Sequence, residues 1–395
     1  MFVVDIINFN ADASCLTAKR WLEMLTGNKK SEFYRWIELY VFYQRKVVLG
    51  FPGATVADVQ CLCPEAWQLV NDNSHLFEVL LRPYSHDLAV LRTDLGFEEN
   101  CKVGFELIQK TFKKVSNWFL PPEFMLTSSQ LVQLKRLAVE GVFINPGRFK
   151  GQRQDRLAKT PYLIQTFDNE LFPCIPFSYE LTKGYLNSLH TFSAEDWNIA
   201  NSALTDQFAF GWRDGESPFF IPDGLLREET WLRKENIKRS RVLLSEALLL
   251  LKFVLPHGDA GTYTQYPAHT LMPWMREMRM LGFVQDLWWQ EQEIAHFDSL
   301  TKFLWLQSIN SDILSAIEKD SPQIQLKALE TSSEYTDFTI WRSERGTEGE
   351  EFLWLLKQAK AGQDLEPWLK ESHKPHLIKL KNRLKIWKDG SHNHA

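Results

Sequence analysis

Short apolar and β-branched runs alternate with amphipathic stretches along the first half of this chain. Such alternation is typical of βα units around a parallel sheet. The expected strands are Phe2–Phe9, Lys46–Leu49, Leu76–Leu81, Asn117–Leu120, Gly141–Asn145 and Tyr162–Thr166. Helical spacing appears between them, as in Ser129–Val139, which carries leucines on one side. The pattern predicts an α/β fold built on a parallel barrel.

The second half of the chain has a different pattern. After about Pro176 the strand signals fade, and residues from about 195 to 320 have the apolar spacing of long helices. We therefore expect a barrel over residues 1–190, a helical domain over 195–320 that completes the site, and a helical, basic extension over 325–395. A solvated helix face is the expected role of the basic tail.

Composition argues against several classes of partner. The net charge is −5, from 45 basic and 50 acidic residues, and no stretch concentrates Lys and Arg for nucleic acid. The longest apolar run, Ala247–Leu251, is far shorter than the ~20 residues of a membrane span. Five cysteines without a CxxC pair indicate neither a disulfide framework nor a zinc site, so a reducing cytoplasm is expected.

In parallel barrels the working residues follow the carboxyl ends of the strands, where the βα loops converge. The predicted strand ends place these polar side chains there: Asn10, Asp12, Ser85, His86, Glu123, Asn145 and Asp168. Two prolines precede Glu123 and fix its loop, which makes it a candidate nucleophile. Asp168 supplies the second carboxylate that glycosidic cleavage requires.

Each of these residues also has a structural interpretation. Glu123 alone would be an ordinary surface glutamate in a strand-to-helix loop. Asp168 would cap a helix, a position that Asp favours. A lone histidine such as His86 is more often structural than a ligand, although its imidazole can also hydrogen-bond a sugar hydroxyl.

Four segments, in order along the chain, resemble glycoside hydrolase family 57, the retaining α-glucan-active amylases and branching enzymes. Glu78–His86 resembles the family's glutamate-to-Ser/Thr-His segment, and Trp118–Glu123 is similar to its WLPE segment. Phe167–Phe172 looks like its FDAELF segment, and Phe303–Asp312 looks like the helical segment that closes its site.

This resemblance implies an incomplete (β/α)7 parallel barrel followed by an α-helical bundle domain. It implies a retaining α-glycosidase or glucanotransferase acting on an α-linked oligo- or polysaccharide, with Glu123 as nucleophile and Asp168 as acid/base. The residues expected to bind substrate are Asn10, Asp12, His86, Trp118 and Asp312. No metal or organic cofactor is then needed.

The chain departs from the family's pattern in two places. Asn8–Asp12 stands where the family has an HxHQP-like segment, so the usual sugar-binding histidines are absent. The interval between Glu123 and Asp168 is shorter than the family's, which indicates trimmed loops or strands around the substrate groove.

Two further functions stay open at this point. A metal-dependent polysaccharide deacetylase has a similar barrel and an Asp-bearing first strand end, but it holds its ion with a histidine pair and an Asp. A non-catalytic barrel that binds a saccharide or a protein would account for the missing histidines, but it would leave both carboxylates idle.

Overall fold

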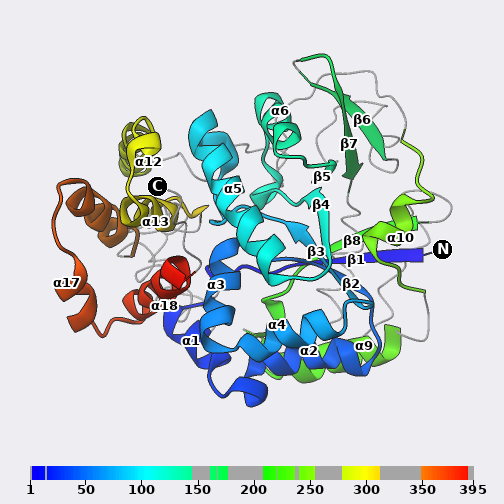
Figure 1. The fold of residues 1–395 in the computed structure, drawn as a ribbon. Helices are drawn as coiled ribbons and strands as arrows, with labels where there is room; N and C mark the ends of the chain where they lie inside the picture. The colour runs from blue at the N-terminus through cyan, green and yellow to red at the C-terminus, as the bar shows by residue number, and fades with distance from the viewer. Residues whose placement is uncertain are drawn as a thin grey trace.

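The computed structural model describes residues 2–13, 16–144, 161–166, 168–176, 208–219, 221–235, 240–253, 278–311 and 348–389. Its centre is a sheet with the strand order β6-β7-β5-β4-β3-β2-β1-β8 (Figure 1). The strands are β1 (Phe2–Asn8), β2 (Val47–Gly50), β3 (Phe77–Leu81), β4 (Val115–Phe119), β5 (Gly141–Ile144), β6 (Tyr162–Gln165), β7 (Leu171–Pro176) and β8 (Phe208–Asp214).

All the strand pairs are parallel except β6 with β7, which form an antiparallel hairpin. Within the described residues β6 and β8 are the two edge strands, so the barrel is incomplete. Its carboxyl-terminal edge is therefore built by seven parallel strands, from β7 at one side to β8 at the other.

Alternation along the strands separates the inside of the barrel from its outer face. Val4 and Ile6 of β1 join a buried cluster that includes Val48 of β2 and Phe210 of β8, so these side chains fill the interior. Ile7 lies in a different cluster, together with side chains of the covering helices. Both faces of the strands are buried, as in other parallel sheets.

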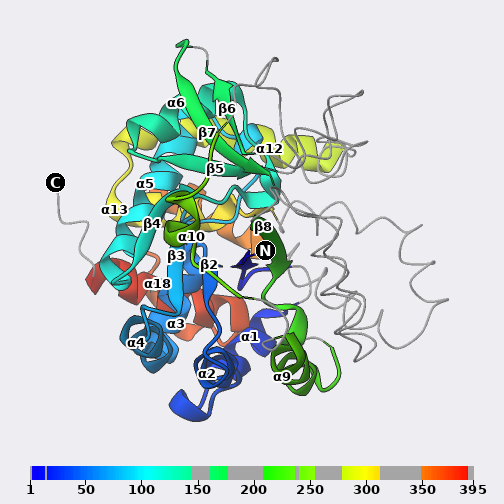
Figure 2. The same cartoon turned by 90° about the vertical axis from the view of Figure 1, so that its right-hand side faces the viewer.

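Helices cover the outer face, and several begin at a capping side chain. Thr17 caps α1 (Ala18–Leu25), Ser31 caps α2 (Glu32–Phe42), and Thr93 caps α5 (Asp94–Thr111). The other helices on this face are α3 (Gly53–Leu62), α4 (Pro64–Asp72), α6 (Ser128–Arg136) and α9 (Gly224–Glu235), whereas the buried side chains of α10 (Leu244–Leu248) join the interior cluster. Each cap satisfies a backbone N–H that the first turn leaves open. Figure 2 shows α2, α4 and α9 along one side of the strands.

A helical part packs beside the barrel at the left of Figure 1. It contains α12 (Met278–Glu291), α13 (Ser299–Ser308), residues 348–360, α17 (Glu366–Glu371) and α18 (Pro375–Asp389). One buried cluster joins these helices to Tyr84, Leu88 and Leu91 of the segment after β3, and to Val103 of α5. The helical part therefore shares a core with the barrel mouth.

The structure confirms the α/β barrel with helices after it, and corrects its extent. The first five strands lie where they are expected, within a few residues. The segment Tyr162–Gln165 is a strand, but it runs antiparallel, and β7 and β8 are not anticipated. Because β8 pairs with β1 along its whole length, the sheet extends beyond the expected boundary at residue 190.

Candidate active site

Glu123 follows β4 at the carboxyl-terminal edge of the barrel, as expected. Pro121 and Pro122 fix the backbone before it, and a short 3-10 turn covers Pro122–Phe124. Both Glu123 and Phe124 have positive φ values, 50° and 53°. Such conformations are strained for side chains of this size and persist where the surroundings over-determine them. The loop therefore holds the Glu123 carboxylate in one place, with its side chain 20% exposed.

His86 lies beside Glu123, with 4.0 Å between His86 Nε2 and Glu123 Oε1. Its other ring nitrogen, Nδ1, is hydrogen-bonded to the Asn10 side-chain amide. Burial lowers the pKa of His86 well below its usual value, and the positive charge of Arg82 lowers it further. The imidazole is therefore neutral at pH 7 and can hydrogen-bond a hydroxyl group.

Asp214 is a second carboxylate at this edge, and the sequence analysis did not identify it. It is the last residue of β8 and faces Asn8, the last residue of β1, in the strand register. Burial raises the pKa of Asp214 to about 6, while a hydrogen bond with Asn8 and the charge of Arg82 oppose the rise. At neutral pH this group therefore lies close enough to its pKa to hold or release a proton.

Arg82 extends from the end of β3 into the space among these acidic groups. Its side chain is buried, and Nη1 donates to the Leu120 carbonyl oxygen at 2.8 Å. Burial lowers the pKa of Arg82 to about 9, although Glu123 and then Glu216 and Asp214 act to raise it. A guanidinium with this pKa remains charged at pH 7, so it favours the ionised form of the carboxylates around it.

Glu216 ties the loop after β8 to the loop after β1. Its Oε2 accepts a hydrogen bond from the Asn10 backbone N–H at 3.4 Å, and its side chain is buried. Gly215, between Glu216 and Asp214, has no room for a side chain, because a Cβ there would lie 2.7 Å from Ile7. The two strand ends therefore pack directly against each other.

Arg213 anchors β8 from the opposite face of the sheet. Its Nη1 donates to Glu228 of α9 at 2.9 Å, and its Nη2 donates to the Tyr40 hydroxyl of α2 at 2.5 Å. Because successive side chains point to opposite faces of a strand, an outward Arg213 directs Asp214 into the barrel.

Asp168 does not lie near Glu123. Gln165, at the end of β6, pairs with Leu171, at the start of β7, and β7 runs parallel to β5. The turn that carries Asp168 is therefore at the amino-terminal edge of the sheet, the opposite edge from Glu123. Asp168 is exposed and accepts a hydrogen bond from the Thr166 hydroxyl. The expectation that it follows a parallel strand is wrong, because strand direction depends on the pairing partner.

The other expected site residues have diverse surroundings. Asn10 and His86 are at the mouth, as expected. Asp12 is buried and bonded to side chains of α18 rather than open to the barrel. Trp118 is a core side chain that packs on Phe143 and is 3% exposed. Asp312 lies outside the described residues.

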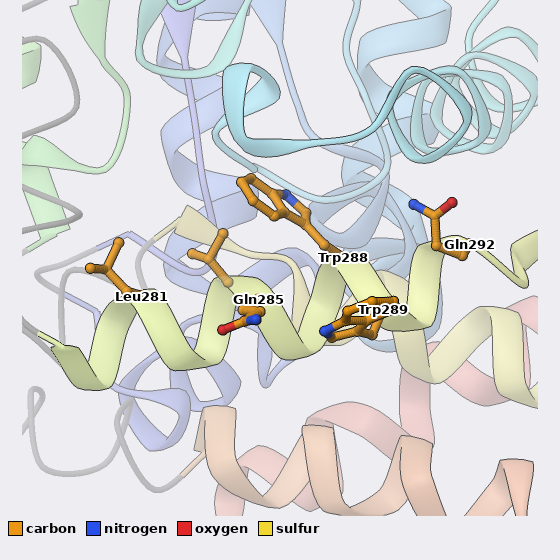
Figure 3. A pocket seen from close by; sticks show the side chains of 6 residues that line it. Leu281, Gln285, Trp288, Trp289 and Gln292 are labelled. Carbon is orange, nitrogen blue, oxygen red and sulfur yellow. The ribbon is translucent and has the colours of Figure 1, made fainter.

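The described ranges contain no group of three or more His, Cys, Asp or Glu side chains arranged to hold a metal ion. None of the helices in these ranges is both long and apolar enough to cross a membrane. A hollow of about 480 Å³ follows one face of α12, lined by Trp288, Trp289 and neighbouring side chains (Figure 3), and it shares no residue with the barrel mouth.

No protein-family model matches this chain, and no curated protein is significantly similar to it in sequence. Solved structures do match. A GH57-type branching enzyme from Pyrococcus horikoshii aligns with a TM-score of 0.63 and 10% identity, over 98% of this chain and 95% of the enzyme.

Two other matches are more distant. An α-amylase from Thermotoga maritima aligns with a TM-score of 0.51 and 10% identity, over 99% of this chain and 98% of that one. An α-mannosidase from Enterococcus faecalis aligns with a TM-score of 0.54 and 11% identity, over 91% of this chain but only 43% of the mannosidase. The chain therefore has the fold of GH57-type enzymes, an incomplete (β/α)7 barrel followed by helices.

Proposed function

We propose that this protein is a retaining enzyme that cleaves or transfers α-linked glycosyl groups, with Glu123 as nucleophile and Asp214 as general acid/base. The observation that carries the proposal is the pair of carboxylates at the ends of β4 and β8, with Arg82 among them. The named activities of the matched structures, branching enzyme, α-amylase and α-mannosidase, support an α-linked saccharide as substrate.

The two carboxylates have the different surroundings that double displacement needs. Arg82 favours the ionised form of Glu123, which can attack the anomeric carbon. The raised pKa of Asp214 lets it donate its proton to the departing glycosidic oxygen in the same step. A water molecule, or a sugar hydroxyl in transfer, then gives a proton to Asp214 and displaces Glu123 from the glycosyl-enzyme. We expect about 5 to 5.5 Å between the two carboxyl groups in the sugar complex.

The mouth also carries groups suited to sugar hydroxyls. The neutral imidazole of His86 and the amide of Asn10 donate and accept hydrogen bonds without adding charge. Asn10 stands in the loop after β1, where the resembling family has histidines, and His86 stands in the segment after β3. We assign them to the sugar ring that reacts with Glu123.

The test is turnover of a panel of α-linked oligosaccharides by the wild type and by Glu123→Gln, Asp214→Asn and Asp168→Asn. We expect Glu123→Gln to lose activity and Asp214→Asn to lose about 10²–10⁴-fold in kcat. Asp168→Asn should keep wild-type rates, because its carboxyl lies at the far edge of the sheet. NMR of the first-formed anomer should show retained configuration.

An activated aryl α-glycoside separates the two roles, because its phenolate leaves without a proton. Asp214→Asn should still release the phenol in a burst, whereas Glu123→Gln should release none. Inverted product, or an Asp168→Asn variant as impaired as Asp214→Asn, would contradict the assignment. Release of acetate from acetylated glycans in place of glycosidic cleavage would favour a deacetylase.

A further inference from the structure

Helix α18 brings two cations into the protein interior. Lys379 and Arg383 are one turn apart on this helix, and their side chains are 1% and 3% exposed. The expectation of a solvated helix face therefore does not hold for Lys379 and Arg383, although Lys385 and Lys388 of the same helix are exposed. Figure 1 shows α18 beside α3 and α1, and these helices are in contact.

The two cations meet two buried carboxylates of the barrel. Lys379 Nζ contacts Asp12 Oδ1, and Arg383 Nη2 donates to Asp12 Oδ2 at 3.0 Å. Arg383 also donates to both oxygens of Asp58 in α3, from Nε at 2.8 Å and from Nη2 at 2.7 Å. Burial acts to lower the pKa of Arg383, but Asp12 and Asp58 outweigh it and raise the pKa.

From Asp12 the contacts continue to the proposed nucleophile. The Asp12 backbone N–H donates to Asn10 Oδ1 at 3.0 Å, and the Asn10 amide is hydrogen-bonded to His86 Nδ1. His86 Nε2 lies 4.0 Å from Glu123 Oε1. Each step is a contact between buried or partly buried groups, so displacing Asp12 moves the side chains that border Glu123.

A second series of hydrogen bonds connects Arg383 of α18 to Tyr84, in the segment that carries His86. Arg383 Nη1 donates to Gln307 Oε1 of α13 at 2.9 Å, and Gln307 Nε2 donates to the Tyr84 hydroxyl at 3.4 Å. Tyr84 is two residues before His86. The Arg383 guanidinium thus donates hydrogen bonds to three elements at once: the loop after β1, α3 and α13.

We propose that Lys379 and Arg383 are positioning residues of the active site. Helix α18 locks Asp12, and through it the Asn10–His86 pair, in the arrangement that receives the sugar ring at Glu123. The inference rests on the proposed function for its catalytic consequence. A lysine in place of Arg383 keeps the charge but cannot reach both carboxylates and Gln307, because only the guanidinium is a planar fork.

The test compares Arg383→Lys with Arg45→Lys. Arg45 is also fully buried and pairs with Asp5 at 3.4 Å, but it stands before β2 at the amino-terminal edge of the sheet. We expect Arg383→Lys to lower kcat/KM about 10–100-fold, because small displacements of substrate-binding groups cost that much. Arg45→Lys should match the wild type in kcat/KM even where its melting temperature falls. Lys379→Met should lower kcat/KM as well, and it is the test variant if Arg383→Lys does not fold.

An NMR measurement tests the same contacts without turnover. The imidazole nitrogen signals of His86, assigned with His86→Gln, should shift in Arg383→Lys and stay in place in Arg45→Lys. If the wild type cleaves no α-glycoside, the proposed function fails, while the His86 signals still decide the positioning role. Equal behaviour of the two lysine variants in both measurements would overturn the inference.

Discussion

Arg82 is the residue whose charge influences both proposed catalytic carboxylates. Burial lowers the pKa of Arg82, the charge of Glu123 opposes that fall, and the charge of Arg82 in turn limits the rise in the pKa of Asp214. It also helps to keep His86 neutral. One side chain therefore acts on the protonation of three neighbours, in addition to the effect of burial on His86 and Asp214.

We predict that kcat/KM falls as the pH rises through about 6, because Asp214 must be protonated to act as the acid. The low-pH limb of the profile reports ionisation of Glu123, and the high-pH limb reports loss of the Asp214 proton. In Arg82→Met both limbs should move to higher pH, because both carboxyl groups lose the charge that favours their ionised forms. The pH dependence of kcat/KM on an α-linked oligosaccharide measures this. An unchanged profile in Arg82→Met would show that Arg82 does not act on these groups.

The raised pKa of Asp214 also has a cost in stability. Its folded pKa of about 6 lies above the ordinary aspartate value of 3.8, so the free energy of unfolding falls as the pH rises between these values and stays lower above them. Asp214→Asn removes the buried charge. It should melt at a higher temperature than the wild type at pH 8, and the difference should shrink at pH 5. Asp168→Asn, at an exposed site, should show no such difference.

The positions of single site residues could be predicted from the sequence where a strand with a clear apolar pattern comes directly before them. Glu123 and His86 follow strands that the sequence identifies, and both lie at the mouth. Asp214 was missed, because Phe167–Phe172 resembles the expected motif more closely. The run Phe208–Asp214, with aromatic residues at alternate positions before Asp-Gly-Glu, is the signal that could have identified it.

At the scale of elements, close backbone packing fixes the segment that carries His86. Gly104 of α5 lies against the chain after β3, and a Cβ at Gly104 would lie 2.4 Å from the Arg82 carbonyl oxygen and from Tyr84 N. Backbone atoms cannot rotate away as a side chain can. Helix α5 and the segment before His86 must therefore separate if Gly104 gains a methyl group.

We predict that Gly104→Ala lowers the free energy of unfolding by about 1–3 kcal/mol, the usual cost of overpacking, and also lowers kcat/KM. Gly282→Ala in α12 is the matched control, since nothing lies within 4 Å of its Cβ position. That variant should be more stable by about 0.5–1 kcal/mol, because alanine favours a helix. Urea denaturation measures both, and equal stabilities would contradict the packing argument.

Strand positions were more predictable than strand directions. A run of β-branched and apolar residues indicates a strand from local sequence alone, and β1 to β5 lie within a few residues of their expected places. Whether a strand is parallel depends on its partner. The antiparallel direction of β6 follows from its hairpin with β7, and this reversal moves Asp168 to the far edge.

Over the whole molecule, one buried apolar cluster joins the helical part to the barrel mouth. Besides the shared apolar cluster, Glu291 of α12 accepts hydrogen bonds from Arg92, and from the backbone and hydroxyl of Thr93 at the start of α5. These contacts cross the boundary that the sequence predicted near residue 195. The sequence indicated the two kinds of architecture, but it could not indicate that α18 packs back onto the loop after β1.

We predict a single cooperative unfolding transition in urea, with the same midpoint by circular dichroism and by tryptophan fluorescence. Tryptophans report on both parts, for example Trp36 in α2 and Trp305 in α13. Glu291→Gln should lower both midpoints together, at a cost of about 3 kcal/mol or more, because it leaves Arg92 without its charged partner. Two separate transitions would indicate that the parts unfold independently.

The pairing of β1 with β8 has a consequence for synthesis of the chain. During synthesis the segment with Glu123 leaves the ribosome well before β8. Strand β1 therefore cannot pair with β8 until residues 208–214 have emerged. Lys379 and Arg383 follow later still. A nascent chain that stops before residue 208 therefore contains the proposed nucleophile without the proposed proton donor. It also leaves one edge of β1 unpaired, where chaperones or other strands can bind.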